Sequence, residues 1–244
     1  MTQPSTNGGT PASSGRTPAQ GNRLDPWYDV YAERAHNLRA SEIRALFSVV
    51  SRPEVVSLAG GMPNLKDLPL DRLAASAEKL IRNHGAQAMQ YGSGQGWEVL
   101  RERITEVMSY DGIIGADPDD VVVTTGSQQA LDLVTELFVN PGDVILAEAP
   151  SYVGALGVFR ARQADIVHVP MDEHGIIPEA LEETIRSVRA SGRTIKFIYI
   201  IPNYHNPAGV TLSAERRPII AEICLREHVL IVEDNPYGLL GFHS

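Results

Sequence analysis

Residues 121–131, VVVTTGSQQAL, join a short β-branched apolar run to a helical pattern through a single glycine. The run predicts a strand over 120–125, and the glycine predicts where that strand ends. A helix over 127–139 is expected to begin at once, because apolar residues then recur on one helical face. These residues are Ala130, Val134, Leu137 and Phe138. A strand that passes directly into a helix is typical of α/β proteins.

Strand-like runs and helical patterns alternate along the rest of the chain. Further apolar runs rich in β-branched residues lie at 144–147, 166–169, 195–201 and 229–232. Helical patterns lie at 178–190 and 213–228. Such runs indicate strands buried on both faces, as in a parallel sheet. The order therefore predicts an α/β fold, in which helices cover both faces of a mostly parallel sheet.

The N-terminal part of the chain has a different character. Residues 1–24 are rich in Gly, Ser, Thr and Pro with hardly any large apolar side chain, so we expect a disordered tail. A helical pattern follows over 27–50, with Asn37 as a candidate cap, and residues 53–70 are irregular. Two more helical stripes follow, made of Leu73, Ala77, Leu80 and Ile81 and of Trp97, Leu100, Ile104, Val107 and Met108.

Composition and charge favour small-molecule chemistry in the cytoplasm. The 244 residues carry a formal net charge of −9, which argues against nucleic-acid binding. No run reaches the ~20 apolar residues of a membrane span, and the N-terminus lacks a secretory signal pattern. Cys224, the single cysteine, lies in an apolar helical pattern that predicts a buried, unreactive thiol. The seven histidines are scattered, so we expect no metal site.

The start of the helix predicted over 127–139 is a candidate anion site. The first turn of a helix has unpaired backbone N–H groups and the positive end of the helix dipole. Gly126 would let an anion approach closely, and the hydroxyl of Ser127 would add a donor. The alternative is that Ser127 is only the N-cap of the helix.

A second glycine cluster, Gly92-Ser93-Gly94-Gln95-Gly96, superficially resembles a dinucleotide-binding loop. It lacks the G-x-G-x-x-G spacing of such loops, and no predicted strand precedes it. We therefore interpret it as a loop that could lie at the edge of a site.

Two predicted strands end in polar residues that could face a ligand. Ligands bind at the carboxyl ends of strands in open α/β sheets, and Asn206 and Asp234 follow such strands. The Asn206 amide could hydrogen-bond a phenolate oxygen, and the Asp234 carboxylate would keep a pyridine nitrogen protonated. The alternatives are an ordinary Asn-Pro turn at Asn206 and a solvated or helix-capping carboxylate at Asp234.

Taken together, four motifs resemble those of class I/II aminotransferases of pyridoxal-phosphate (PLP) fold type I. They are Gly126–Leu131, Pro150-Ser151-Tyr152, Asn206-Pro207-Ala208-Gly209 and Asp234-Asn235-Pro236-Tyr237. The segment 57–64, SLAGGMPN, and Gln90-Tyr91 are similar to the branch that contains aminoadipate, kynurenine and broad-range 2-oxoacid aminotransferases. The resemblance covers residues 40–244 and implies pyridoxal 5'-phosphate as the cofactor.

The resemblance implies a role for each matched residue. Ser127 and Gln128 would bind the cofactor phosphate, and Tyr152 would stack on the pyridine ring. Asn206 and Tyr237 would donate hydrogen bonds to the 3-oxygen of that ring.

Asp234, which would pair with the ring nitrogen, and Tyr152 are the catalytic candidates that the resemblance assigns to this chain. Tyr91 would reach the phosphate in the site of a partner subunit, which implies a homodimer. Gly60 and Gly61 would lie near the substrate carboxylate, and Asn206 would also contact the substrate.

One part of the family pattern is missing. In the family, the Schiff-base lysine follows the Asp-x-x-Tyr motif at a distance that this chain, ending at Ser244, does not reach. The three lysines, Lys66, Lys79 and Lys196, do not match it. The arginine that binds the substrate carboxylate would lie further on as well. We therefore expect a truncated form of a longer enzyme, inactive by itself.

The complete enzyme is expected to move an amino group between an amino acid and a 2-oxo acid by a ping-pong mechanism. Residues 25–62 would form an N-terminal helix and an arm that packs with the small domain and the substrate site. Residues 63–244 would form the large, PLP-binding domain, incomplete at its C-terminus. The alternatives are a non-catalytic fragment and a ligand-sensing domain of a transcription regulator, although residues 1–26 are too few and too polar for a winged-helix domain.

Overall fold

The computed structural model describes residues 25–36, 54–56 and 65–241. The tail predicted over 1–24, the candidate cap Asn37, the helix predicted to continue to residue 50, and Gly60 and Gly61 lie outside these described residues. The chain divides into two compact units, residues 1–37 and 38–244. In the first unit, a 3-10 turn at Tyr28–Val30 precedes the short helix α1 at Glu33–His36.

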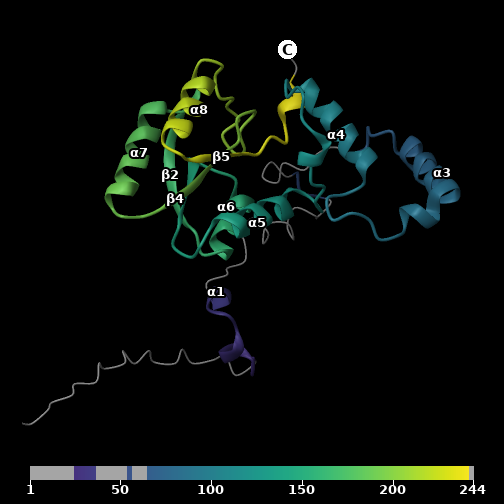
Figure 1. Cartoon of the computed structure of the whole chain (residues 1–244), viewed down its shortest axis with the longest axis horizontal. Coiled ribbons are helices and arrows are strands. Elements are labelled where there is room, and N and C mark those ends of the chain that lie inside the picture. The colour runs from purple at the N-terminus through teal and green to yellow at the C-terminus, as the bar shows by residue number, and fades with distance from the viewer. Residues whose placement is uncertain (1–24, 37–53, 57–64, 242–244) are drawn as a thin grey trace, which may run out of the picture. The chain divides into compact units, whose positions relative to one another are not determined.

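Five strands form one sheet in the described part of the second unit (Figure 1). They are β1 (Val144–Ala149), β2 (Asp165–Asp172), β3 (Gly175–Ile176), β4 (Ile195–Ile200) and β5 (Leu230–Glu233). Their order is β3-β2-β1-β4-β5, and neighbours run parallel except for the antiparallel pair of β2 and β3. The predicted α/β fold with a mostly parallel sheet is confirmed.

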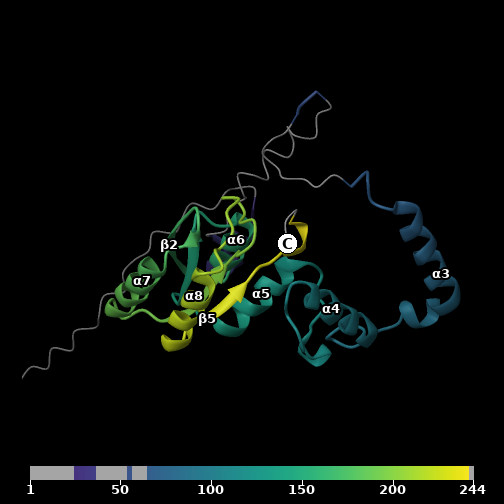
Figure 2. The same ribbon diagram turned by 90° about the horizontal axis from the view of Figure 1, so that it is seen from above.

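Helices cover both faces of this sheet, as Figures 1 and 2 show. The helices α5 (Ser127–Phe138) and α6 (Val153–Ala161) pack on one face. The helices α7 (Pro178–Ala190) and α8 (Arg216–Arg226) pack on the other. The helix predicted over 178–190 matches α7, whereas α8 is shorter than the predicted 213–228.

Side chains alternate along the central strands and so divide the core in two. Val144 and Leu146 of β1 join the cluster under α7 and α8, whereas Ile145 and Ala147 join the cluster under α5 and α6. Because successive side chains on a strand face opposite sides, an unbroken apolar run buries both faces, as predicted for β1 and β4. That prediction is wrong for β2 and β5, which are partly exposed. Both lie toward the edges of the sheet, where β3 protects only two residues of β2.

The strand predicted over 120–125 is not part of the sheet. Residues Pro118–Asp120 form a 3-10 turn, and residues 121–125 are irregular. The Val123 N–H instead donates to the Gln95 carbonyl at 2.7 Å. Gly96 packs so closely here that a Cβ atom on it would lie 2.6 Å from Val123 Cγ2. The run therefore packs against the glycine cluster at 92–96, which is a loop as predicted.

The two helical stripes predicted before residue 110 are confirmed as α3 (Leu70–Ala88) and α4 (Glu98–Tyr110). No side chain of α3 is buried within the described structure. In α4, the buried Arg101 donates from Nη1 to the Pro118 carbonyl at 2.6 Å and to Asp119 Oδ1 at 2.9 Å. None of the helices in the described segments is long and apolar enough to cross a membrane.

Local patterns did not predict α6 and β3. Gly154 and Gly157 lie within α6, and glycine disfavours a helix. The segment is helical nevertheless because Ala155, Leu156 and Phe159 are buried against the sheet. The buried state predicted for Cys224 is confirmed, and burial raises the pKa of its thiol to about 11.

This topology brings the candidate motifs to one edge of the sheet. The end of α5 leads into β1, so a helix that packs back along the sheet begins near the carboxyl end of β1. Tyr152 follows β1, Asn206 follows β4 and Asp234 follows β5 directly. These three strands are adjacent and parallel. The four motifs therefore converge where α/β sheets bind their ligands.

Candidate active site

The start of α5 forms an open, polar cradle. Gly126 has a φ of +92°, and no heavy atom lies within 4 Å of the place that a Cβ atom would occupy. Ser127 is the first helical residue and Gly126 takes the N-cap position, so the alternative in which Ser127 is the N-cap is wrong. Ser127 and Gln128 are both exposed. Their hydroxyl, amide and backbone N–H groups are donors of the kind that phosphate requires.

A side-chain hydrogen bond fixes the backbone just before this cradle. Gln129 Oε1 accepts from the backbone N–H of Thr125 at 2.6 Å and from its hydroxyl at 2.8 Å. The Thr124 hydroxyl donates to the Gly126 carbonyl at 3.1 Å. The irregular run that replaces the predicted strand is therefore tied to the first turn of α5.

Tyr152 lies at the N-cap of α6, with its ring against the backbone of Gly154. A Cβ atom at position 154 would come within 2.4 Å of Tyr152 Cζ, so only glycine leaves this place for the ring. Tyr152 is half-buried and packs against the cluster that contains Phe159 and Tyr199. Tyr152 thus lies partly in the core, and part of its side chain remains exposed.

Asp234 is held by a tyrosine that the sequence analysis did not select. The Tyr199 hydroxyl donates to Asp234 Oδ2 at 2.7 Å, and the Asp234 N–H donates to the Ile200 carbonyl at 2.9 Å. Asp234 is half-buried and hydrogen-bonded, so it is neither fully solvated nor a helix cap. The Tyr199 ring is fully buried and meets Phe159 edge to face at 5.4 Å between centroids.

The electrostatics of Tyr199 make its hydroxyl a permanent donor. Burial, and next the hydrogen bond to the Asp234 carboxylate, raise the pKa of Tyr199 far above its usual value. The hydroxyl therefore keeps its proton at neutral pH. Oδ2 of Asp234 accepts the hydrogen bond from the Tyr199 hydroxyl, and the second carboxylate oxygen can accept a hydrogen bond from another donor.

Asn206 lies in a loop closed by its own backbone. The His205 N–H donates to the Val210 carbonyl at 2.8 Å, and the Gly209 N–H donates to the His205 carbonyl at 2.5 Å. The turn proposed as the alternative is thus present, with the half-buried Asn206 inside it. Tyr237 is also half-buried and comes just before a 3-10 turn at Gly238–Leu240.

These residues share one face of the sheet. Leu131 of α5, Tyr152, Tyr199 and Val232 of β5 belong to a single apolar cluster. Ser127 begins the helix that contributes Leu131, and Asp234 is bonded to Tyr199. The structure therefore brings the Ser127, Tyr152 and Asp234 motifs to the same side and the same edge of the sheet.

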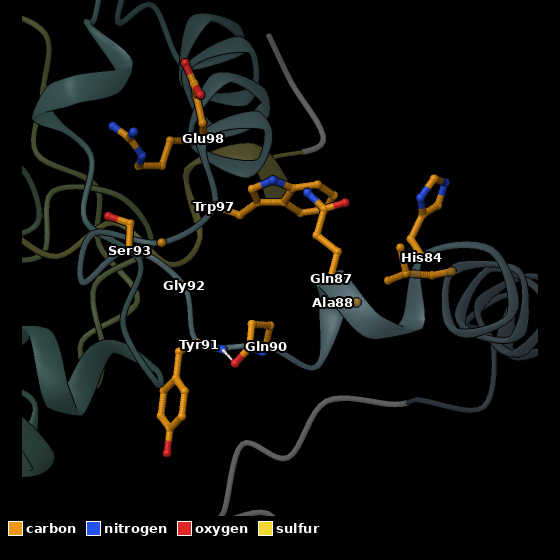
Figure 3. Close-up of a pocket in the computed structure, with 12 residues that line it drawn as sticks. His84, Gln87, Ala88, Gln90, Tyr91, Gly92, Ser93, Trp97 and Glu98 are labelled. Carbon is orange, nitrogen blue, oxygen red and sulfur yellow. Dashed lines mark hydrogen bonds between the residues drawn. The ribbon is translucent and has the colours of Figure 1, made fainter.

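Tyr91 is not brought into this group. Tyr91 is fully exposed, and Figure 3 shows its ring pointing away from the side chains of Gln87 and Trp97. Tyr91, Gln87 and Trp97 line a cavity of about 440 Å³ between the end of α3 and the start of α4. No residue of the four motifs lines this cavity. Gly60 and Gly61 lie outside the described residues.

Lys196 lies at the opposite end of its strand from the converging motifs. Lys196 is near the amino end of β4, where its Nζ lies 3.3 Å from Asp143 Oδ2. Lys79 is an exposed residue of α3. No group of His, Cys, Asp and Glu among the described residues could hold a metal ion.

Sequence reasoning missed three buried polar residues near the site, namely Tyr199, Glu148 and His205. Glu148 gave a usable signal, because a carboxylate inside an otherwise apolar strand is buried only when it has partners. Tyr199 occupies the same kind of position in β4, where its ring suits the core and its hydroxyl needs an acceptor. Each signal indicates a buried hydrogen bond without indicating its partner.

The residues present match the chemical groups of PLP. The cradle at Gly126 supplies open space and phosphate donors, the Tyr152 ring supplies an aromatic face, and Asp234 supplies an oriented carboxylate. Phosphate, aromatic ring and basic ring nitrogen are the groups that these three features match.

Comparison with known proteins points the same way. The family model for aminotransferase class I and II matches residues 53–244. Aromatic-amino-acid aminotransferase 1 of Thermococcus litoralis is 39% identical over 212 residues, which cover 87% of this chain and 51% of that protein. The chain spans about half the length of the curated relatives it matches.

Solved structures of similar proteins share the fold. The kynurenine aminotransferase of Pyrococcus horikoshii, in complex with PMP, has a TM-score of 0.80 at 34% identity, over 88% of this chain and 53% of its own. The α-aminoadipate aminotransferase LysN of Thermus thermophilus, complexed with N-(5'-phosphopyridoxyl)-L-leucine, has a TM-score of 0.74 at 33% identity, over 85% of this chain and 49% of its own. This chain belongs to the class I and II aminotransferase family, whose fold type I sheet and ordered motifs it carries.

Proposed function

We propose that this chain provides the cofactor-binding part of a PLP-dependent aminotransferase, which moves an amino group between an amino acid and a 2-oxo acid. The family and the phosphopyridoxyl compound in a related structure support PLP as the cofactor. The observation that carries the proposal is that two features share one face and one edge of the sheet. They are the start of α5 and the Asp234 carboxylate, which is hydrogen-bonded to Tyr199.

The cradle at the start of α5 binds the cofactor phosphate. Ser127 and Gln128 donate from their side chains, and the backbone N–H groups of the first helical turn add to them. Gly126 keeps the approach open because it carries no side chain. The helix dipole further favours the negative charge of the phosphate at this end.

Asp234 and Tyr199 act together at the pyridine nitrogen. Tyr199 occupies Oδ2 of the carboxylate, and we assign the remaining oxygen to the N–H of the ring. A carboxylate next to that nitrogen holds a proton on it. When bound and protonated in this way, the cofactor withdraws electrons from the substrate α-carbon and makes its α-proton acidic.

The remaining residues orient the ring. Tyr152 stacks on its face, with a ring position that Gly154 makes possible. Asn206 and Tyr237 donate hydrogen bonds to the 3-oxygen, and Asn206 also contacts the substrate. Together they would hold the ring in one fixed orientation toward the substrate.

The remainder of the active site is supplied by other parts of the complete protein. We propose that the lysine that attaches the cofactor and moves the α-proton, and the arginine that binds the substrate carboxylate, belong to the part of the complete protein outside this chain, which spans about half the length of its relatives. We also assign Gly60 and Gly61 to the binding of that carboxylate. Tyr91 reaches the phosphate in a partner subunit's site, so the enzyme is a homodimer, and its full exposure in the single chain supports this role.

The test is an amino-donor panel on the complete protein loaded with PLP. Addition of a good amino donor alone shifts the visible absorbance of the bound cofactor, and a 2-oxo acid added afterwards restores it, because the reaction proceeds in two half-reactions. If no donor shifts the absorbance of a protein that retains the cofactor, the proposed activity is wrong.

A further inference from the structure

Two buried titratable residues lie beside the site and have no part in the proposed chemistry. Glu148, near the end of β1, is 1% exposed, and His205, just before Asn206, is 2% exposed. A charged or ionisable group at such depth is costly unless it is paired. Their contacts explain why both are buried here.

Glu148 Oε2 has two contacts, one with the backbone at the end of β4 and one with the loop that carries Asn206. It accepts from the backbone N–H of Ile201 at 2.8 Å, just beyond β4. The same oxygen lies 3.1 Å from Nε2 of His205. That second contact is not aligned as a hydrogen bond, so it acts as an attraction between the carboxylate and the ring N–H dipole.

The other nitrogen of His205 fixes the ring's proton. Nδ1 lies 3.2 Å from the backbone nitrogen of Ala208, whose N–H can only donate. Nδ1 therefore carries a lone pair, and in the neutral imidazole the proton is on Nε2, which faces Glu148. The imidazole thus bridges a carboxylate in the sheet and an amide in the loop.

Asn206 lies between the two anchored positions of this loop. His205 is held on its N-terminal side, and Ala208 is held to His205 on its other side. Glu148 also comes shortly before Tyr152 in the chain, so one buried carboxylate lies at the base of both loops that flank the cofactor ring.

We infer that Glu148 and His205 form a positioning pair that holds the Asn206 amide in place for the 3-oxygen of the cofactor ring. Neither residue is exposed enough to touch a ligand itself, so the pair acts through Asn206. The inference rests on the proposed function, because it needs a ligand whose ring oxygen Asn206 contacts.

The test is a double-mutant cycle on the complete protein with pyridoxamine phosphate, which has the same ring and phosphate but makes no covalent bond. His205→Asn keeps an acceptor for Ala208 but is too short to reach Glu148. His205→Gln reaches Glu148 with a donor but loses the acceptor for Ala208. Each weakens pyridoxamine phosphate binding about tenfold in the wild-type background, and neither weakens it further in an Asn206→Ala background.

A control separates positioning from loss of stability. Arg216→Gln disrupts the ion pair between Asp172 and Arg216, the first residue of α8. This variant lowers the melting temperature without changing the affinity for pyridoxamine phosphate. Equal losses in the wild-type and Asn206→Ala backgrounds would overturn the inference, as would unchanged affinity in both His205 variants.

A measurement on the wild type makes the result independent of how the variants fold. If Glu148 and His205 fix the conformation of the Asn206 loop before the ligand binds, the Ala208 and Gly209 amides are protected from hydrogen exchange in the ligand-free protein. Free exchange of these amides in the ligand-free protein contradicts the inference. A wild-type protein that fails to bind pyridoxamine phosphate would instead contradict the proposed function.

Discussion

The Tyr199 hydroxyl, on the fourth strand, donates a 2.7 Å hydrogen bond to Oδ2 of Asp234, the residue directly after the fifth strand. The bond fixes one carboxylate oxygen and so sets the direction of the other. Replacement of Tyr199 by Phe removes the hydroxyl and preserves the ring packing against Phe159. We expect turnover of the complete enzyme to fall about 10- to 100-fold, since hydrogen bonds to charged groups contribute about 1.5–3 kcal/mol.

Steady-state kinetics and the absorbance of the bound cofactor measure this effect. Tyr110→Phe serves as the control for loss of a tyrosine hydroxyl, because Tyr110 is 79% exposed. Wild-type turnover in Tyr199→Phe would mean that Asp234 needs no second residue to orient it.

Two glycines of α6 offer a matched pair of substitutions. Gly154→Ala would place a Cβ atom 2.4 Å from Tyr152 Cζ, whereas Gly157 has no heavy atom within 4 Å of that position. We expect Gly154→Ala to displace the Tyr152 ring and weaken PLP binding about tenfold. Gly157→Ala should leave binding unchanged and add up to about 1 kcal/mol of stability through helix propensity. Equal PLP affinities for the two variants would show that Tyr152 does not stack on the ring.

The phosphate cradle predicts a selective loss of affinity. Ser127→Ala removes a hydroxyl donor from the first turn of α5 and leaves the helix intact. Equilibrium dialysis should show PLP binding weakened about tenfold and the binding of pyridoxal, which lacks the phosphate, unchanged. An equal loss for both compounds would place Ser127 somewhere other than at the phosphate.

The ion pair of Arg216 with Asp172 predicts a pH-dependent contribution to stability. Arg216 contacts both carboxylate oxygens of Asp172, at 2.6 and 2.8 Å, and lowers the pKa of that carboxyl from 3.8 to about 2. A carboxyl whose pKa is lower in the folded state stabilises the protein above its unfolded pKa and loses that effect as pH falls.

Thermal melting of the wild type and Arg216→Gln measures that contribution. The difference in melting temperature should be full at neutral pH and shrink as the pH falls from about 4 to about 2. A residual difference should remain, because Arg216 also donates to the carbonyls of Gly175 and Ile176. A difference that grows on acidification would contradict the assignment.

The sequence predicts the elements whose signals are local. The run at 144–147 and the stripe at 178–190 became β1 and α7, because apolar spacing follows directly from which side chains meet the core. The run at 120–125 is also rich in β-branched residues but pairs with no strand of the described sheet, and strand formation depends on such a neighbour. The helix α6 shows the reverse, since burial of Phe159 outweighs two glycines that disfavour a helix.

The candidate site was predictable where a residue ends a strand or begins a helix. Ser127, Asn206 and Asp234 occupy such positions, and parallel topology places them at one edge. The residues that support them were not predictable in the same way. The contact of Tyr199 with Asp234 spans 35 positions and that of Glu148 with Ile201 spans 53, so neither follows from spacing.

The central claim is that the Asp234 carboxylate keeps the cofactor nitrogen protonated. Asp234→Asn has the same shape and can still accept from Tyr199, but it carries no charge. In the complete enzyme loaded with PLP, we measure the rate at which excess amino donor converts the bound cofactor in a single half-reaction. We expect the variant to retain the cofactor and to react at least about 100-fold more slowly than the wild type. Retained cofactor with a wild-type rate would mean that the Asp234 charge does not hold the proton on the ring nitrogen.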